Sequence, residues 1–117
     1  DAITAAARQV AQTISAEAIV TFTSSGSTTL RAARERPTVP ILGLTPIEST
    51  ARRLTLTWGV HSVRTRVLHS FREMVDKAGM VAKRDEFAQS GGKLVVTAGV
   101  PFGTPGTTNI LRIAKVK

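Results

Sequence analysis

The stretch from Ala18 to Arg36 constrains the fold most, because it predicts a buried strand, a tight turn and the start of a helix in direct succession. Residues 18–22 are apolar or β-branched, which is typical of a strand that is covered on both faces. From Thr29 onward the residues are compatible with a helix. A strand that leads directly into a helix is typical of α/β proteins with a parallel sheet.

The turn within this stretch carries five hydroxyl groups around one glycine. Its residues are Thr23, Ser24, Ser25, Gly26, Ser27 and Thr28. Gly26 has no Cβ, so the backbone can fold tightly there. The first N–H groups of the following helix should point into the turn, where they and the positive end of the helix dipole favour an anion. We therefore expect these six residues to bind a phosphate group.

A simpler interpretation of the same turn is a helix N-cap, since Ser and Thr often cap helices and Gly eases the turn before them. The chain has no G-x-x-x-x-G-K-[ST] loop and no G-x-G-x-x-G motif. The sequence therefore predicts neither a nucleoside-triphosphate loop nor a dinucleotide site.

Length and charge narrow the class of protein further. The 117 residues suit one domain, and Lys and Arg total 16 against 8 Asp and Glu, a formal net charge of +8. This charge favours anionic partners. Aromatic residues make up only 4% of the chain and the basic residues form no block, so a phosphorylated small molecule is favoured over nucleic acid.

Catalytic and metal-binding patterns are missing from the sequence. The chain has no Cys, and His61 and His69 lack the spacing of a metal site. Ser25 lacks the leading glycine of a G-x-S-x-G nucleophile turn. We therefore expect no catalytic residue and no metal ligand here. The apolar runs are too short for a membrane span and no signal peptide is evident, so we expect a cytoplasmic protein.

Apolar periodicity and turn residues predict nine elements in the order αβαβαβαββ. Helices are expected at residues 1–17, 28–36, 46–58 and 70–84, and strands at 18–22, 41–45, 60–66, 93–100 and 109–116. A helix that begins at residue 1 suggests that the chain is cut from a longer one. Trp58, at the end of an apolar helical face, is expected in the core.

The last two predicted strands are joined by residues 101–108, which are too few for a crossover helix and therefore predict an antiparallel hairpin. The expected fold is α/β with three αβα layers, and its five-stranded sheet is mostly parallel with the last strand antiparallel. Ligands of such sheets lie at the carboxyl ends of the strands. Residues 23–28 and 101–108 both follow strands, so we expect them to meet at that edge.

Three separated runs resemble the C-terminal domain of bacterial pyruvate kinases. They are Ala18-Ile-Val-Thr-Phe-Thr-Ser-Ser-Gly-Ser-Thr28, Pro40-Ile-Leu-Gly-Leu-Thr-Pro46 followed by Thr50-Ala-Arg-Arg-Leu54, and the run from Val95 to Ile113. The resemblance implies that a catalytic barrel, which holds Mg²⁺ and K⁺, lies upstream. It also implies that this segment cannot phosphorylate ADP alone, and that it serves allosteric control and homotetramer contacts.

In the family that the chain resembles, a T-x-S-G-x-[ST] turn holds the effector phosphate. The pattern maps onto Thr23, Ser25, Gly26 and Thr28, with Ser24 and Ser27 in the variable places. Gly103, Thr104 and Gly106 correspond to a second effector loop. Members that respond to fructose 1,6-bisphosphate use a Trp and an Arg for the second phosphate. Residues 78–93 contain no Trp and the last loop lacks the Arg, so the resemblance favours a monophosphate such as AMP or a sugar monophosphate.

One alternative keeps the fold but not the kinase. The chain would then be a stand-alone module that binds an anion or phosphometabolite, with no barrel attached. The gene upstream of Asp1 distinguishes the two readings, because the first requires a barrel-encoding region there and the second requires a start codon.

Overall fold

The computed structural model describes residues 2–98 and 110–117 of the chain. Its helices are α1 (Ala2–Ile14), α2 (Ser27–Arg34), α3 (Glu48–Leu54) and α4 (Phe71–Arg84). Its strands are β1 (Ala18–Phe22), β2 (Ile41–Thr45), β3 (Val60–Arg64), β4 (Lys93–Ala98) and β5 (Ile110–Lys115). No helix in the described ranges combines the length and the apolar character that crossing a membrane requires.

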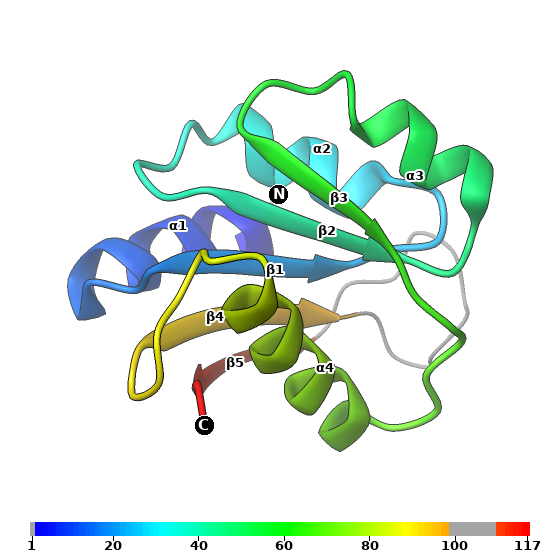
Figure 1. Ribbon diagram of the computed structural model, residues 1–117. Coiled ribbons are helices and arrows are strands. Elements are labelled where there is room, and N and C mark those ends of the chain that lie inside the picture. The colour runs from blue at the N-terminus through cyan, green and yellow to red at the C-terminus, as the bar shows by residue number, and fades with distance from the viewer. Residues whose placement is uncertain (1, 99–109) are drawn as a thin grey trace.

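The strands form one sheet in the order β3-β2-β1-β4-β5 (Figure 1). β1 pairs in parallel with β2 on one side and with β4 on the other, and β2 pairs in parallel with β3. β5 runs antiparallel to β4, with Lys93 opposite Lys115 and Ala98 opposite Ile110. The predicted hairpin and the mostly parallel sheet are therefore confirmed.

Helices cover both faces of the sheet, as the three-layer prediction requires. α4 lies on one face and α1, α2 and α3 lie on the other (Figure 1). The core under α4 joins alternate residues of the central strands to the helix, namely Val20, Leu42, Val96, Ala78 and Val81. The core on the opposite face contains Ile19, Val95, Ala7, Ala11 and Ala32. β1 is therefore buried from both sides, which explains its apolar composition.

α2 packs closely on the sheet because β2 carries a glycine where the helix crosses it. A Cβ on Gly43 would lie 3.0 Å from Cγ2 and 3.3 Å from Oγ1 of Thr29. The Thr29 hydroxyl in turn lies 2.6 Å from the hydroxyl of Thr21 on β1. The missing side chain thus makes room for a buried hydrogen bond between α2 and the central strand.

Local hydrogen bonds mark both ends of α4. Ser70 is the N-cap of α4, and its Oγ accepts from the N–H of Glu73 at 3.1 Å. The Glu73 carboxylate lies 3.1 Å from Arg66. At the other end, Asp85 accepts from Arg84 at 2.8 Å and lies 2.9 Å from Nε2 of His61 on β3. These hydrogen bonds, of which the one from Arg84 has the larger effect, hold the pKa of the Asp85 carboxyl well below its usual range.

The structure corrects the expected end of α3 and the expected burial of Trp58. α3 ends at Leu54, four residues before the predicted end at Trp58, and Trp58 is 88% exposed and not in the core. The N–H groups of Thr55, Leu56 and Thr57 each bond to the carbonyl three residues earlier, so the chain tightens and the 3.6-residue apolar face does not continue.

Gly43→Ala is expected to destabilise the fold by about 1–3 kcal/mol, because the added methyl group must displace Thr29 and break its bond to Thr21. Gly79→Ala is the matched control, because Gly79 lies in α4 and a Cβ there meets nothing within 4 Å. This control should stabilise the protein by about 1 kcal/mol through helix propensity. Urea unfolding measures both, and equal stability of the two variants would contradict the close packing of α2.

Candidate functional site

The Ser/Thr turn, residues 23–28, lies at the carboxyl end of β1, in the middle of the sheet. The chain runs outward from β1 through β2 to β3 and then returns to β4 on the other side of β1, so the strand order reverses between β1 and β4. In open parallel sheets the crevice at such a reversal is where ligands bind. The predicted site therefore lies at the position that the topology favours.

Gly26 gives the turn its shape. It is the N-cap of α2 and adopts φ 92° and ψ −8°, a left-handed conformation that suits glycine. Its carbonyl accepts the first helical bond, from the N–H of Leu30 at 3.0 Å. The sequence allowed Ser or Thr to be the cap, but a glycine stands there and no side chain caps the helix. The N-cap residue therefore supplies no hydroxyl, and the turn hydroxyl that accepts from the first residue of α2 is Ser25 Oγ, at 3.3 Å from the N–H of Ser27.

The backbone amides of the turn divide into two groups. The N–H of Gly26 donates to Thr23 Oγ1 at 2.8 Å, and the N–H of Ser27 donates to Ser25 Oγ at 3.3 Å. The N–H groups of Ser24 and Ser25 donate to no other residue within the described part of the chain. Those two donors, with the exposed Ser25 side chain, are positioned to meet a ligand from solvent.

The six predicted residues differ in exposure. Ser25 is exposed, Thr23, Ser24 and Ser27 are half-buried, and Thr28 is buried. Ser25 Oγ lies 3.3 Å from Ser27 Oγ, so the structure brings these two hydroxyls together. The partners of Ser25 Oγ among the described residues are groups of Ser27, which include no base. The arrangement can therefore bind an anion but does not activate Ser25 as a nucleophile.

Side chains of α3 hydrogen-bond to backbone carbonyls of the turn, and these contacts were not predicted from the sequence. Thr50 Oγ1 donates to the carbonyl of Ser24 at 2.8 Å, and Arg53 donates to the carbonyl of Ser25 at 3.1 Å. Leu54 packs 3.4 Å from the position that a Cβ on Gly26 would take. The run Thr50-Ala-Arg-Arg-Leu54 was singled out as a motif, but nothing in its spacing relates it to the turn.

The second predicted loop cannot be compared with this site. Gly103, Thr104 and Gly106 lie outside the described residues, so their part in an effector site stays a prediction. The strands that flank this loop are β4 and β5, whose pairing brings Ala98 opposite Ile110.

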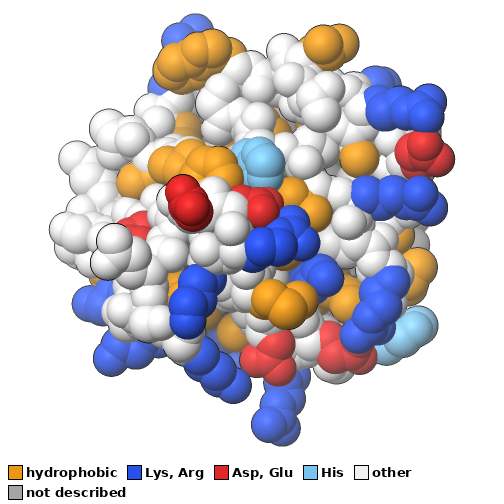
Figure 2. Space-filling view, in the orientation of Figure 1, with side chains coloured by type: hydrophobic (Ala, Val, Ile, Leu, Met, Phe, Trp, Pro, Cys, Tyr) orange, Lys and Arg blue, Asp and Glu red, His pale blue; other side chains and the backbone are white. Residues whose placement is uncertain are grey.

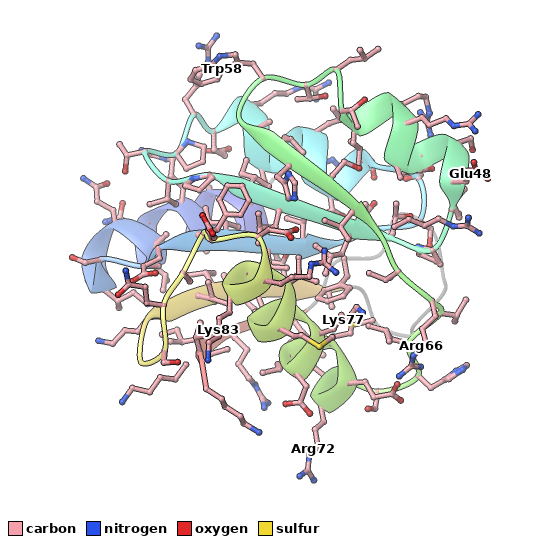
Figure 3. The ribbon with its side chains drawn as sticks, viewed as in Figure 1. Glu48, Trp58, Arg66, Arg72, Lys77 and Lys83 are labelled. Atoms are coloured by element: carbon pink, nitrogen blue, oxygen red, sulfur yellow. The ribbon has the colours of Figure 1, made fainter. Side chains whose placement is uncertain are left out.

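A hollow of about 770 Å³ lies at the other edge of the sheet, before the first residues of β2 and β3. It is lined by the end of α2, by residues 36–41 and 57–61, and by Phe87. Trp58 borders it and projects outward from the ribbon (Figure 3). The hollow could not be predicted from the sequence, in which Trp58 was expected in the core. None of the residues that line the hollow belongs to the Ser/Thr turn, so the two are separate.

The basic residues form no block on the visible surface, just as they form none in the sequence. Lys and Arg side chains are spread over the visible face, with Asp and Glu among them (Figure 2). Several pair with acids, as Arg52 and Arg64 do with Glu48. Among the described residues, no three His, Asp or Glu side chains gather as a metal site would require.

Thr50→Val tests whether α3 fixes the turn. Thr50 is buried, and the valine would leave the Ser24 carbonyl and Arg53 without their hydroxyl partner. We expect a loss of about 1–2 kcal/mol in the free energy of unfolding and large NMR shift changes at the amides of residues 24–26. Thr55→Val removes an exposed hydroxyl at the C-cap of the same helix and is the control. Equal effects of the two variants would contradict the role of Thr50.

Known proteins resemble this chain over almost its whole length. The family model described as "Pyruvate kinase, alpha/beta domain" matches residues 1–114. A pyruvate kinase of Methylorubrum extorquens is 47% identical over 99% of this chain and 24% of the relative. One of Agrobacterium vitis is 43% identical over 97% of this chain and 24% of the relative. The solved structure of Cryptosporidium parvum pyruvate kinase in complex with ADP has a TM-score of 0.89 at 27% identity and covers 99% of this chain and 23% of that chain. The chain thus spans about a quarter of the length of these relatives.

Proposed function

This chain belongs to the pyruvate kinase alpha/beta domain family, and from that premise we propose that it is the regulatory and assembly domain of a cytoplasmic pyruvate kinase. The parent enzyme transfers a phosphoryl group from phosphoenolpyruvate to ADP. The Mg²⁺ and K⁺ of that reaction would be held by the catalytic barrel, which the family resemblance places upstream of this segment. The domain contributes control and not chemistry.

We propose that the controlling ligand is a phosphorylated small molecule held by residues 23–28. The single observation that carries this proposal is the turn at the reversal of strand order, where the N–H groups of Ser24 and Ser25 have no partner among the described residues. Free amide donors and hydroxyls at the start of α2 are the groups that bind phosphate oxygens. The net charge of +8 attracts such a ligand.

Regulation would follow from contacts that differ between two states. The turn joins β1 to α2 and is bonded to α3 through the carbonyls of Ser24 and Ser25. A phosphate bound there would link β1, α2 and α3. It would therefore stabilise the arrangement of neighbouring domains in which these three elements keep the positions that bind it. The effector changes activity only to the extent that it binds one arrangement more tightly than the other.

Ser25→Asp is expected to weaken the binding of phosphate, AMP and glucose 6-phosphate at least about tenfold, because it places a carboxylate beside the ligand's own negative charge. Isothermal titration calorimetry on the 117-residue chain measures the affinities. Ser90→Asp is the control, since it adds the same charge at an exposed site in the turn before β4. The proposal fails when the unmodified chain binds none of the three ligands, or when both variants lose affinity equally.

Assembly is supported by the edge of the sheet. The outer side of β5 pairs with no described strand, and its Ile113 side chain is 50% exposed. An open strand edge with an exposed apolar residue is a surface on which a second copy can pair. We therefore propose that β5 contributes to contacts between subunits of a homo-oligomer.

Ile113→Lys is expected to shift the chain toward monomer, because a lysine blocks pairing along the edge. Sedimentation velocity over a range of concentrations measures the state of association. Val67→Lys is the control, because Val67 is similarly exposed, at 56%, but lies outside the sheet. A chain that is monomeric before substitution, or that associates equally in both variants, would count against assembly through β5.

A further inference from the structure

The hollow before the first residues of β2 and β3 has the size of a small-molecule site. Its volume of about 770 Å³ lies within the range of about 300–1,000 Å³ that is usual for such sites. Its walls are mostly apolar and come from α2, from the chain segments that lead into β2 and β3, and from the segment after α4. They include Leu30, Pro37, Val39, Pro40, Val60 and Phe87. The hollow can therefore remove the apolar body of a ligand from water.

Two arginines give the hollow a positive charge that no carboxylate balances. Arg34 and Arg36 line it, and none of its described lining residues is Asp or Glu. Glu35, which lies between the two in sequence, is 3.8 Å from Arg8. Arg34 and Arg36 themselves form no ion pair within the described part of the chain. The negative end of the α2 dipole amounts to about half a charge, so it offsets only part of the charge of the two arginines.

The histidine of the lining already has a partner. Nε2 of His61 lies 2.9 Å from Oδ2 of Asp85, and the centre of its ring lies 4.9 Å from that of Phe87. His61 therefore belongs to the wall of the hollow. A negatively charged ligand would be met by the two arginines.

Trp58 stands at the rim of the hollow with most of its indole in water. It is 88% exposed and projects outward from the ribbon (Figure 3). An indole is a flat apolar surface on which an aromatic ring can stack, and stacking there would bury area that water now covers. Leu56 is equally exposed, at 88%, but it does not line the hollow. These two residues thus form a matched pair for a test.

We propose that the hollow is a second ligand site, which binds a small molecule with a flat aromatic body and one carboxylate. The body would lie against the apolar walls and stack on Trp58. The planar guanidinium groups of Arg34 and Arg36 would pair with the carboxylate. A carboxylate suits the hollow better than a phosphate dianion, because a double charge is harder to desolvate among apolar walls. This inference does not depend on a phosphate site at residues 23–28.

The backbone of Arg36 allows its charge to be removed without strain. Its φ is 52°, which is left-handed, and its N–H donates to the carbonyl of Ala33 at 3.1 Å, just after the end of α2. Glycine is the residue most often found in this conformation after a helix. Arg36→Gly should therefore leave the fold intact while it removes the guanidinium.

The test compares 2-naphthoate with 2-naphthamide, which has the same aromatic body without the charge. Both are titrated into the 117-residue chain while NMR follows the amide signals of residues 57–61. We expect saturable shifts there and about tenfold tighter binding of 2-naphthoate. Arg36→Gly should lose about threefold for 2-naphthoate and almost nothing for 2-naphthamide. Trp58→Ser should weaken both ligands equally, whereas Leu56→Ser should change neither.

Arg72→Gln is the charge-matched control, because Arg72 lies on α4, at the opposite end of the molecule from Trp58 (Figure 3). It should leave both affinities unchanged, since solvent and salt screen a charge at that distance. Equal losses in Arg36→Gly and Arg72→Gln, equal affinities for the two ligands, or the absence of saturable shifts at residues 57–61 would overturn the inference.

The same ligand is then titrated into the full-length parent enzyme by calorimetry. Binding of 2-naphthoate that Arg36→Gly weakens about threefold supports the site in the whole protein. Absence of binding would mean that another part of the protein covers the hollow, and binding that Arg36→Gly leaves unchanged would mean that the ligand sits elsewhere. Either of these two results would overturn the inference.

Discussion

The burial of β1 is the constraint on which the rest of the structure depends. This strand pairs on both sides and is covered on both faces, and each of its five residues is buried. A strand held in this way cannot shift without breaking two ladders and two cores. Its carboxyl end is therefore held in place, and the turn that follows it starts from a fixed position at the surface.

Much of the fold could be predicted because its signals are local. Apolar runs located β1 and β2 to the residue, and the short link after β4 identified an antiparallel hairpin. The exposure of Trp58 could not be predicted, since it depends on the tightening of the chain after Leu54, which periodicity does not report. For the candidate site, sequence located the hydroxyl-rich turn, but the support from Thr50 and Arg53 comes from contacts between residues more than twenty positions apart.

α3 lies between two different surfaces of the molecule. Its middle residues bond to the turn at one edge of the sheet, and the chain that leaves it reaches Trp58 and the hollow at the other. The helix is short, and it packs on β2 and β3. A displacement of the turn would therefore act on α3 through the hydrogen bonds of Thr50 and Arg53.

The single tryptophan, at 88% exposure, has a practical consequence for anyone who studies this domain in solution. The chain contains no tyrosine, so its intrinsic fluorescence arises almost entirely from the indole of Trp58, which borders the hollow. Emission from that indole should be red-shifted and readily quenched while water surrounds it. A protein surface that covers Trp58 would shift the emission to the blue. The native chain could therefore report docking at this place without an added fluorescent label.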